Sequence, residues 1–124
     1  METINLNRFK PYIQILRPEI ADMDFALPAA TVLSATYFAY PDTIHSTGKF
    51  PDLFAFIIAV IGGYFAITSS YVFNDYCDVD IDEINLPHRP LPSARMTRKQ
   101  ALYYTFLLLM IAGIVAAYLN PESL

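Results

Sequence analysis

The feature that most constrains this chain is the run from Leu53 to Phe73, LFAFIIAVIGGYFAITSSYVF, which contains no charged residue. A second uncharged run covers Ala101 to Leu119, and a third apolar block covers Phe25 to Tyr40, preceded by Ile20 to Asp24. Each block is close to the roughly 20 residues that an α-helix needs to cross a bilayer. The pattern predicts an all-α, polytopic membrane helical bundle with transmembrane helices near residues 20–40, 53–73 and 100–119.

The composition agrees with a membrane protein and excludes other classes. The 124 residues are 55% hydrophobic, and the charged fraction of 16% lies below the quarter that is usual in soluble domains. No basic surface stretch is present, so we expect no nucleic-acid partner. The single cysteine, Cys77, excludes an internal disulfide and a multi-cysteine metal site.

The Lys and Arg residues of the connecting segments predict an orientation in the membrane. The loop between the first two blocks, residues 41–52, carries only Lys49. The other basic residues lie before the first block or between the second and third: Arg8, Lys10, Arg17, Arg89, Arg95, Arg98 and Lys99. Because cytoplasmic loops are enriched in Lys and Arg, we expect a multi-pass cell-membrane protein with a cytoplasmic N-terminus and a cytoplasmic 74–99 loop. The 41–52 loop and the C-terminus are then expected on the other side.

An acidic segment, NDYCDVDIDEINLPHRPLPS, directly follows the second block and covers Asn74 to Ser93. If the helix continues past Phe73, its rotation of about 100° per residue places Asp75, Asp78 and Asp82 on one face. Asp80 then points to the opposite side. Charged groups beside a membrane span are expensive to desolvate, and they commonly mark functional sites. Three carboxylates on one face suit a hard cation such as Mg²⁺ or Ca²⁺, so the segment predicts a metal site.

The acidic segment raises two other interpretations. A solvated acidic helix end is the simpler alternative. An EF-hand loop starting at Asp78 is excluded, because Glu83 stands where the loop requires glycine and Arg89 where it requires glutamate.

The residues after the aspartates predict a contact with an anion. Asn85, His88 and Arg89 lie on a loop that is stiffened by prolines, and arginine's planar fork recognises phosphate oxygens well. Arg89 is therefore predicted to contact substrate, whereas His88 is interpreted as a loop residue and not as a base. Three further basic residues are expected to set topology and contact lipid headgroups: Arg95, Arg98 and Lys99.

Three smaller features bear on helix packing and helix ends. Gly62-Gly63 either lets another helix approach closely or is an ordinary pair of membrane-helix glycines. Pro28 predicts a kink in the first span. The third helix is expected to restart near Thr97, with Thr97 or Ser93 as its N-cap.

Together these residues resemble the first aspartate-rich motif of the UbiA superfamily of membrane prenyltransferases, N-D-x-x-D-x-x-x-D. The continuation I-N-x-P-x-R-P-L-P-S, here Ile84 to Ser93, and Arg17-Pro18 before the first span are also similar to the family. The resemblance implies an all-helical, Mg²⁺-dependent membrane enzyme that moves a prenyl group from a polyprenyl diphosphate to an acceptor. It implies catalytic and metal-binding roles for Asp75, Asp78 and Asp82, and diphosphate-binding roles for Asn74, Asn85 and Arg89.

The I-N-x-P-x-R-P form is similar to the branch that includes chlorophyll synthases and archaeal geranylgeranylglyceryl-phosphate prenyltransferases. It implies a geranylgeranyl donor, and it leaves open whether the acceptor is aromatic, tetrapyrrole or lipid. Metal ions would stabilise the departing diphosphate, and aromatic faces can stabilise a prenyl cation. The tyrosines of the spans are either such faces or core packing: Tyr64, Tyr71, Tyr103 and Tyr104.

The chain departs from the family pattern at three points. Ala94 stands where glycine usually follows P-S, and Asp22 and Asp24, interfacial or pocket residues, lie where a neutral polar residue is usual. The family usually has nine transmembrane helices and a second aspartate motif, so residues 1–124 resemble its N-terminal third. We therefore expect the isolated chain to be inactive and to need a C-terminal partner polypeptide that completes the bundle. The alternative is a small non-catalytic membrane protein that binds divalent cations or prenyl lipids through partner subunits.

Overall fold

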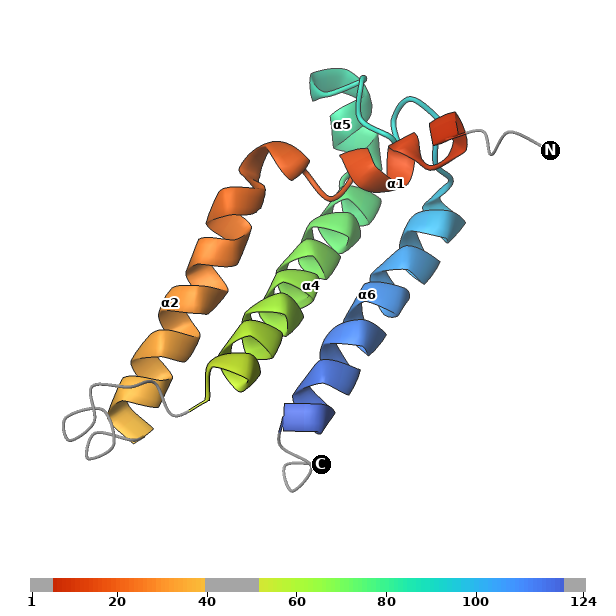
Figure 1. The fold of residues 1–124 in the computed structure, drawn as a ribbon. Helices are drawn as coiled ribbons and strands as arrows, with labels where there is room; N and C mark the ends of the chain where they lie inside the picture. Colours follow the sequence, from red (N-terminus) through yellow and green to blue (C-terminus); the bar gives the residue numbers. More distant parts are fainter. Residues whose placement is uncertain (1–5, 40–51, 120–124) are drawn as a thin grey trace.

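The computed structural model describes residues 6–39 and 52–119, and its long elements are three helices. These are α2 (Ala21–Ala39), α4 (Leu53–Cys77) and α6 (Arg98–Leu119), and α4 lies between the other two (Figure 1). All three stretches that were predicted to span a membrane are therefore helical where they are described. Residues 41–51 of the predicted 41–52 loop lie outside the described residues.

Short elements gather at one end of the three long helices. They are η1 (Leu6–Arg8), α1 (Lys10–Gln14), η2 (Pro18–Ile20) and α5 (Val79–Asn85) (Figure 1). The turns between α5 and α6 lie at the same end. The basic residues that predicted the orientation are therefore carried by segments that share one end of the bundle.

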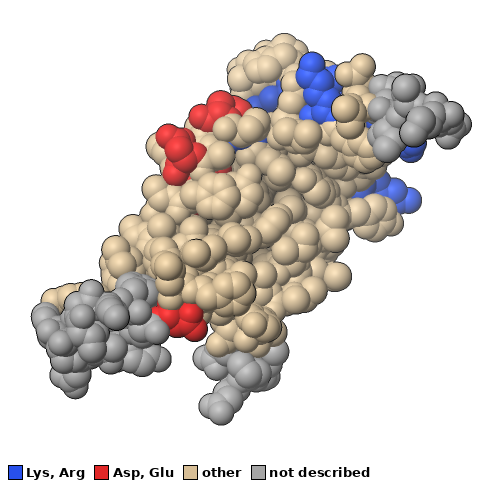
Figure 2. All heavy atoms as spheres, in the orientation of Figure 1, with Lys and Arg blue, Asp and Glu red and all other residues tan. Residues whose placement is uncertain are grey.

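The helices α4 and α6 are long and apolar enough to cross a membrane. Only 17% and 11% of their apolar windows are buried within the structure, whereas the core helix of a soluble protein would be mostly buried. On the face shown in Figure 2, a broad belt without Lys, Arg, Asp or Glu separates the charged residues of the two ends. These features indicate a membrane helical bundle.

The helix α2 does not meet the same test in the described part of the chain. It carries Asp22 and Asp24 in its first turn and Pro28 in its interior, which lower its apolar character. Two of the three predicted transmembrane helices are therefore supported, and a crossing by α2 stays a prediction.

The pair Gly62-Gly63 lies in contact with both neighbouring helices. A Cβ atom on Gly62 would lie 2.7 Å from Cγ1 of Val115 on α6, and one on Gly63 would lie 2.6 Å from Cβ of Pro28 on α2. Neither position has room for a side chain without a shift of its neighbour. The interpretation that these glycines permit close helix approach is confirmed, and it holds on two sides of α4 at once.

The start of α6 is fixed by a reciprocal cap. The Gln100 backbone N–H donates to Oγ1 of Thr97 at 3.1 Å, and the Thr97 N–H donates to Oε1 of Gln100 at 2.9 Å. This capping box satisfies two backbone donors that no helical carbonyl can reach. Of the two N-caps that the sequence allowed, Thr97 is confirmed.

The buried apolar residues concentrate at the end that carries the short elements. Ile15 follows α1, Val72 lies near the end of α4, and Val79 begins α5. Leu91 and Met96 come from the turns before α6 and belong to the same cluster. This cluster holds α1, α5 and the turns against the long helices. Close packing of this kind fixes the positions of the polar residues that the same segments carry.

Candidate active site

The acidic segment is divided between two helices. α4 continues past Phe73 as expected, but it ends at Cys77, and the chain turns at Asp78 with φ −96° and ψ 10°. α5 begins at Val79, so Asp82 belongs to a separate helix. The single continuous helix on which the three aspartates were aligned is therefore wrong beyond Cys77.

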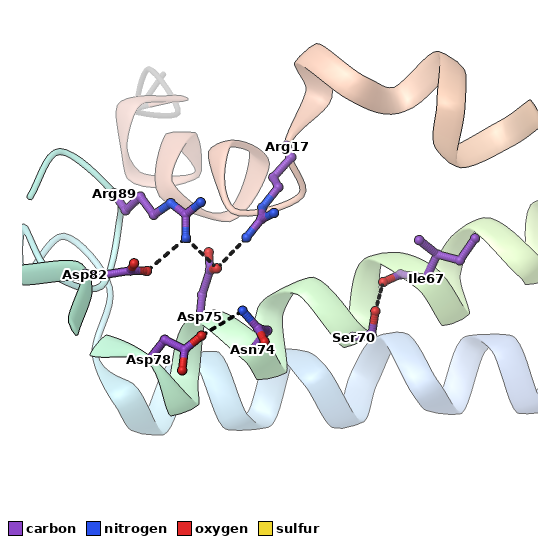
Figure 3. Close-up of polar contacts among 8 residues, drawn as sticks. All are labelled: Arg17, Ile67, Ser70, Asn74, Asp75, Asp78, Asp82 and Arg89. Atoms are coloured by element: carbon purple, nitrogen blue, oxygen red, sulfur yellow. Dashed lines mark hydrogen bonds and ion pairs between the residues drawn. The ribbon is translucent and has the colours of Figure 1, made fainter. Parts of the chain in front are cut away.

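Asp75 and Asp82 nevertheless converge on one cation, the guanidinium of Arg89. Nη1 of Arg89 donates to Oδ1 of Asp75 at 3.1 Å and to Oδ2 of Asp82 at 2.9 Å (Figure 3). Nη2 of Arg17 donates to the same Asp75 oxygen at 2.7 Å. The two aspartates are 3% and 6% exposed, so these contacts replace water for nearly buried charges.

Asp78 makes its polar contact elsewhere. Its Oδ2 accepts from Nδ2 of Asn74 at 3.0 Å, and both residues lie apart from the arginine contacts in Figure 3. Asn85 ends α5 with an exposed side chain. Of the residues predicted to form the site, the structure thus brings together Asp75, Asp82 and Arg89.

Asp80, on α5, lies outside this group. It is exposed, and its Oδ1 accepts from Nη2 of Arg98 at 2.7 Å. Exposed pairs of this kind contribute little to stability.

Arg17 is the site residue that the sequence analysis missed. The Arg17-Pro18 pair resembles the family's entry to the first span, but no local spacing connects Arg17 to Asp75, 58 residues away. Its backbone is left-handed, with φ 53° and ψ 60°, directly before Pro18. The guanidinium also lies 4.8 Å from the ring centroid of Tyr71. A non-glycine residue in this backbone region is strained, and such strain concentrates at functional sites.

A half-open cavity of about 380 Å³ adjoins these residues. Three arginines line it (Arg17, Arg89 and Arg95), together with His88 and the carboxylates of Asp75 and Glu19. Guanidinium groups at a cavity wall are suited to bidentate binding of phosphate oxygens. The cavity can therefore receive an anion beside the aspartates.

Arg95 was expected to contact lipid headgroups, but its side chain is engaged within the chain. It donates to the His88 carbonyl at 2.6 Å and to Oγ of Ser93 at 2.9 Å, and it also bonds Oε1 of Gln14. These contacts fix the turns before α6 to α1. Ala94, next to it, adopts φ 56°, so the left-handed turn persists where the family usually has glycine.

The arrangement of the carboxylates decides whether they fit a metal ion. Among residues 6–39 and 52–119, no three Asp, Glu, His or Cys side chains are grouped so that they could hold one. Asp75 and Asp82 already share a single cationic nitrogen, at 3.1 and 2.9 Å, so both can face one cation. Carboxylate oxygens are ligands that Mg²⁺ prefers. The pair Asp75 and Asp82 therefore fits a divalent cation that completes its coordination with water or phosphate oxygens, provided that Arg89 releases the two carboxylates.

Asp24 is buried, and not an exposed interfacial acid. It is 3% exposed, and its Oδ1 accepts from the Tyr71 hydroxyl at 2.7 Å. Its Oδ2 is also buried and has no hydrogen-bond partner among the described residues. A buried polar atom without a partner typically costs about 1–3 kcal/mol. Asp22, two residues earlier, is exposed.

Among the four tyrosines of the spans, one lies at the polar site and the other three lie elsewhere. Tyr104 packs edge-to-face on Tyr12 at 5.4 Å, and Tyr103 is exposed. Tyr64 stacks on Phe25 of α2 at 4.2 Å. Tyr71 lies next to Arg17 and Asp24, so it is the tyrosine that reaches the polar site.

Comparisons with known proteins identify the family of this chain. The model of the UbiA prenyltransferase family matches residues 29–124. The digeranylgeranylglyceryl phosphate synthase of Methanosarcina barkeri is 33% identical over 114 residues, which are 90% of this chain and 39% of the relative. The enzyme of the same name from Methanosphaera stadtmanae is 32% identical over 91% of this chain and 36% of the relative. A third, from Pyrococcus furiosus, is 40% identical over 73 residues, 59% of this chain and 26% of the relative.

The chain spans well under half the length of these curated relatives. No solved structure matches it. The family match covers the whole acidic segment and the arginine loop, which is where the structure brings carboxylates and guanidinium groups together. The chain belongs to the UbiA prenyltransferase family.

Proposed function

We propose that this chain supplies the diphosphate-binding part of a membrane prenyltransferase. The observation that carries the proposal is the arrangement of Arg17 and Arg89 on Asp75, at the wall of an arginine-lined cavity. A polyprenyl diphosphate needs such a site at the end of an apolar bundle, because its head is anionic and its tail is apolar.

The relatives suggest the two substrates. Their name describes a synthase of digeranylgeranylglyceryl phosphate, a glyceryl phosphate that carries two geranylgeranyl groups. We therefore assign geranylgeranyl diphosphate as the donor and a glyceryl phosphate lipid with a free hydroxyl as the acceptor.

The proposed mechanism assigns separate tasks to the carboxylates and the arginines. Asp75 and Asp82 would hold Mg²⁺, Asp78 is kept as a third ligand on the basis of the motif, and Arg17 and Arg89, released from the carboxylates, would bind diphosphate oxygens. Asn74 would position Asp78 through their existing hydrogen bond, and Asn85 is kept as a diphosphate contact on the basis of the motif. When bound, the metal stabilises negative charge on the leaving diphosphate.

The proposal includes an arrangement of the bundle in the membrane. We propose that α2 is the third span, because it packs against α4 and its Pro28 lies against Gly63. The arginine-rich end is assigned to the cytoplasm by the excess of basic residues there. This orientation supports the proposal because soluble magnesium is available on that side.

Full turnover is proposed for the assembly of this chain with the remaining family helices. The chain matches 26–39% of the length of the relatives. We expect the isolated chain to bind donor without transferring the prenyl group, and a complementary polypeptide to complete the bundle.

The test uses labelled geranylgeranyl diphosphate, Mg²⁺ and membranes that contain the assembled enzyme. Asp75→Ala and Asp78→Ala should each abolish transfer, whereas Glu83→Ala, which changes an exposed acid of the same segment, should not. Unchanged turnover in both aspartate variants would contradict the assignment of roles. Robust transfer by the isolated chain would contradict the need for a partner.

A further inference from the structure

Asp24 is the buried acid that the proposed diphosphate site does not use. It lies in the first turn of α2, is 3% exposed, and binds the Tyr71 hydroxyl through Oδ1 at 2.7 Å. Its Oδ2 is buried and has no partner in the described part of the chain. A buried acceptor in this state requires an explanation, and an unseen donor is the most direct one.

The position of Tyr71 relates Asp24 to the diphosphate site. Tyr71 and Asp75 are four residues apart on α4, so they lie on the same face, about 6 Å apart along the helix axis. Arg17 connects the two levels, because its guanidinium donates to Asp75 and lies 4.8 Å from the Tyr71 ring centroid. Asp24 is therefore linked to Asp75 through Tyr71 and Arg17, and its hydrogen-bond partner on α4 lies about one helical turn before Asp75.

We expect the reacting carbon of a bound donor to lie near this turn of α4. With the diphosphate at the level of Asp75, the allylic carbon bonded to it comes next along the molecule, and the apolar tail continues along the uncharged part of α4. An acceptor hydroxyl that attacks this carbon must lose its proton nearby. Asp75 and Asp82 are engaged by arginines and are assigned to the metal, whereas Oδ2 of Asp24 is free of any described partner.

We propose that Oδ2 of Asp24 accepts the hydrogen bond of the acceptor's hydroxyl and takes its proton during transfer. The hydroxyl oxygen forms a bond to the allylic carbon, and the bond from that carbon to the diphosphate oxygen breaks. The electron pair of the broken bond leaves with the diphosphate, and the hydroxyl proton moves to Oδ2. The Tyr71 hydroxyl keeps Oδ1 occupied and so leaves Oδ2 for the substrate. This inference rests on the proposed function.

A binding experiment tests the inference without turnover. The 124-residue chain in lipid nanodiscs is given a geranylgeranyl glyceryl phosphate with a free hydroxyl, or the same lipid with that hydroxyl methylated. Wild-type chain should prefer the free hydroxyl by about tenfold, a difference that corresponds to one good hydrogen bond. Asp24→Asn, which keeps the size of the side chain, should lose most of this preference. Asp22→Asn, at the exposed acid of the same turn, should keep it.

A kinetic experiment tests the proton transfer. In membranes with the assembled enzyme, Asp24→Asn should lower prenyl transfer on the order of a hundredfold or more, the usual range for a general base. Donor binding, measured in the same membranes, should stay within about twofold of wild type. Transfer near the wild-type rate, or equal loss of donor binding and transfer, would overturn the role of Asp24. If wild-type membranes neither bind donor nor transfer it, the proposed function fails instead.

Discussion

Arg17 donates from Nη2 to Oδ1 of Asp75 at 2.7 Å and thereby joins the entry of α2 to the C-terminal end of α4. The contact connects residues 58 positions apart, and its acceptor, Asp75, is only 3% exposed. Because the first aspartate of the motif is held by a residue outside the motif, the geometry of the site depends on the N-terminal segment.

The first prediction concerns the stability contributed by this contact. Arg17→Ala leaves the buried Asp75 with Arg89 alone, so we expect the free energy of unfolding to fall by about 1–3 kcal/mol. Arg98→Ala removes a pair with Asp80 whose members are 51% and 85% exposed, and should cost less than about 0.5 kcal/mol. Unfolding in mixed detergent micelles measures both. Equal losses in the free energy of unfolding would show that the Arg17 contact stabilises the fold no more than an exposed ion pair does.

The second prediction concerns competition between Arg89 and a divalent cation. Arg89 bridges Asp75 and Asp82, so a cation must displace it from both oxygens. Arg89→Gln should therefore raise the affinity for Mn²⁺, used as a probe for Mg²⁺, by about tenfold, or roughly 1.4 kcal/mol. Electron paramagnetic resonance of free Mn²⁺ gives the affinity, with Arg98→Gln as the control. Weaker Mn²⁺ binding in Arg89→Gln would mean that the arginine supports the metal instead of competing with it.

The third prediction concerns the glycine pair. A Cβ at Gly63 would lie 2.6 Å from Cβ of Pro28, a stiff ring that cannot turn away. Gly63→Ala should cost about 1–3 kcal/mol of stability through overpacking. At Gly113, a Cβ meets nothing within 4 Å, so Gly113→Ala should gain roughly 0.5–1 kcal/mol through better helix formation. A neutral Gly63→Ala would show that α2 does not pack this closely on α4.

The fourth prediction concerns the left-handed residue in the loop. Ala94 has φ 56°, which places its Cβ against the backbone. Ala94→Gly should raise the free energy of unfolding by about 0.5–1 kcal/mol, because relief of this strain exceeds the added chain entropy. Ala112→Gly, in the interior of α6, should lower it by about 1 kcal/mol. If both substitutions destabilise equally, Ala94 carries no such strain.

The helices were predictable because their causes are local. An uncharged run such as Leu53 to Phe73 can be satisfied in a membrane only by a helix, and Thr97 with Gln100 forms its cap from neighbouring residues. Arg89 was also found locally, since prolines fix the loop that carries it. These features depend on residues that are close in the sequence.

The remainder of the site depends on tertiary packing. The helix breaks at Asp78, and α5 docks on the buried cluster through Val79. Helical periodicity alone does not predict this docking. The approach of Arg17 to Asp75 and the burial of Asp24 against Tyr71 require α2 to be placed on α4. The acids Asp22 and Asp24 look alike in the sequence, and only the packed helix distinguishes the exposed one from the buried one.

The most direct test of the central claim is the affinity of the chain in nanodiscs for geranylgeranyl diphosphate with Mg²⁺. If Arg89 binds the diphosphate, Arg89→Ala should weaken this affinity at least about tenfold, a loss typical of a charge-assisted contact. Arg98→Ala, which removes an exposed arginine of the same end, should stay within about twofold of wild type. Equal affinities of the Arg89→Ala and wild-type chains would contradict the assignment of this site to the donor diphosphate.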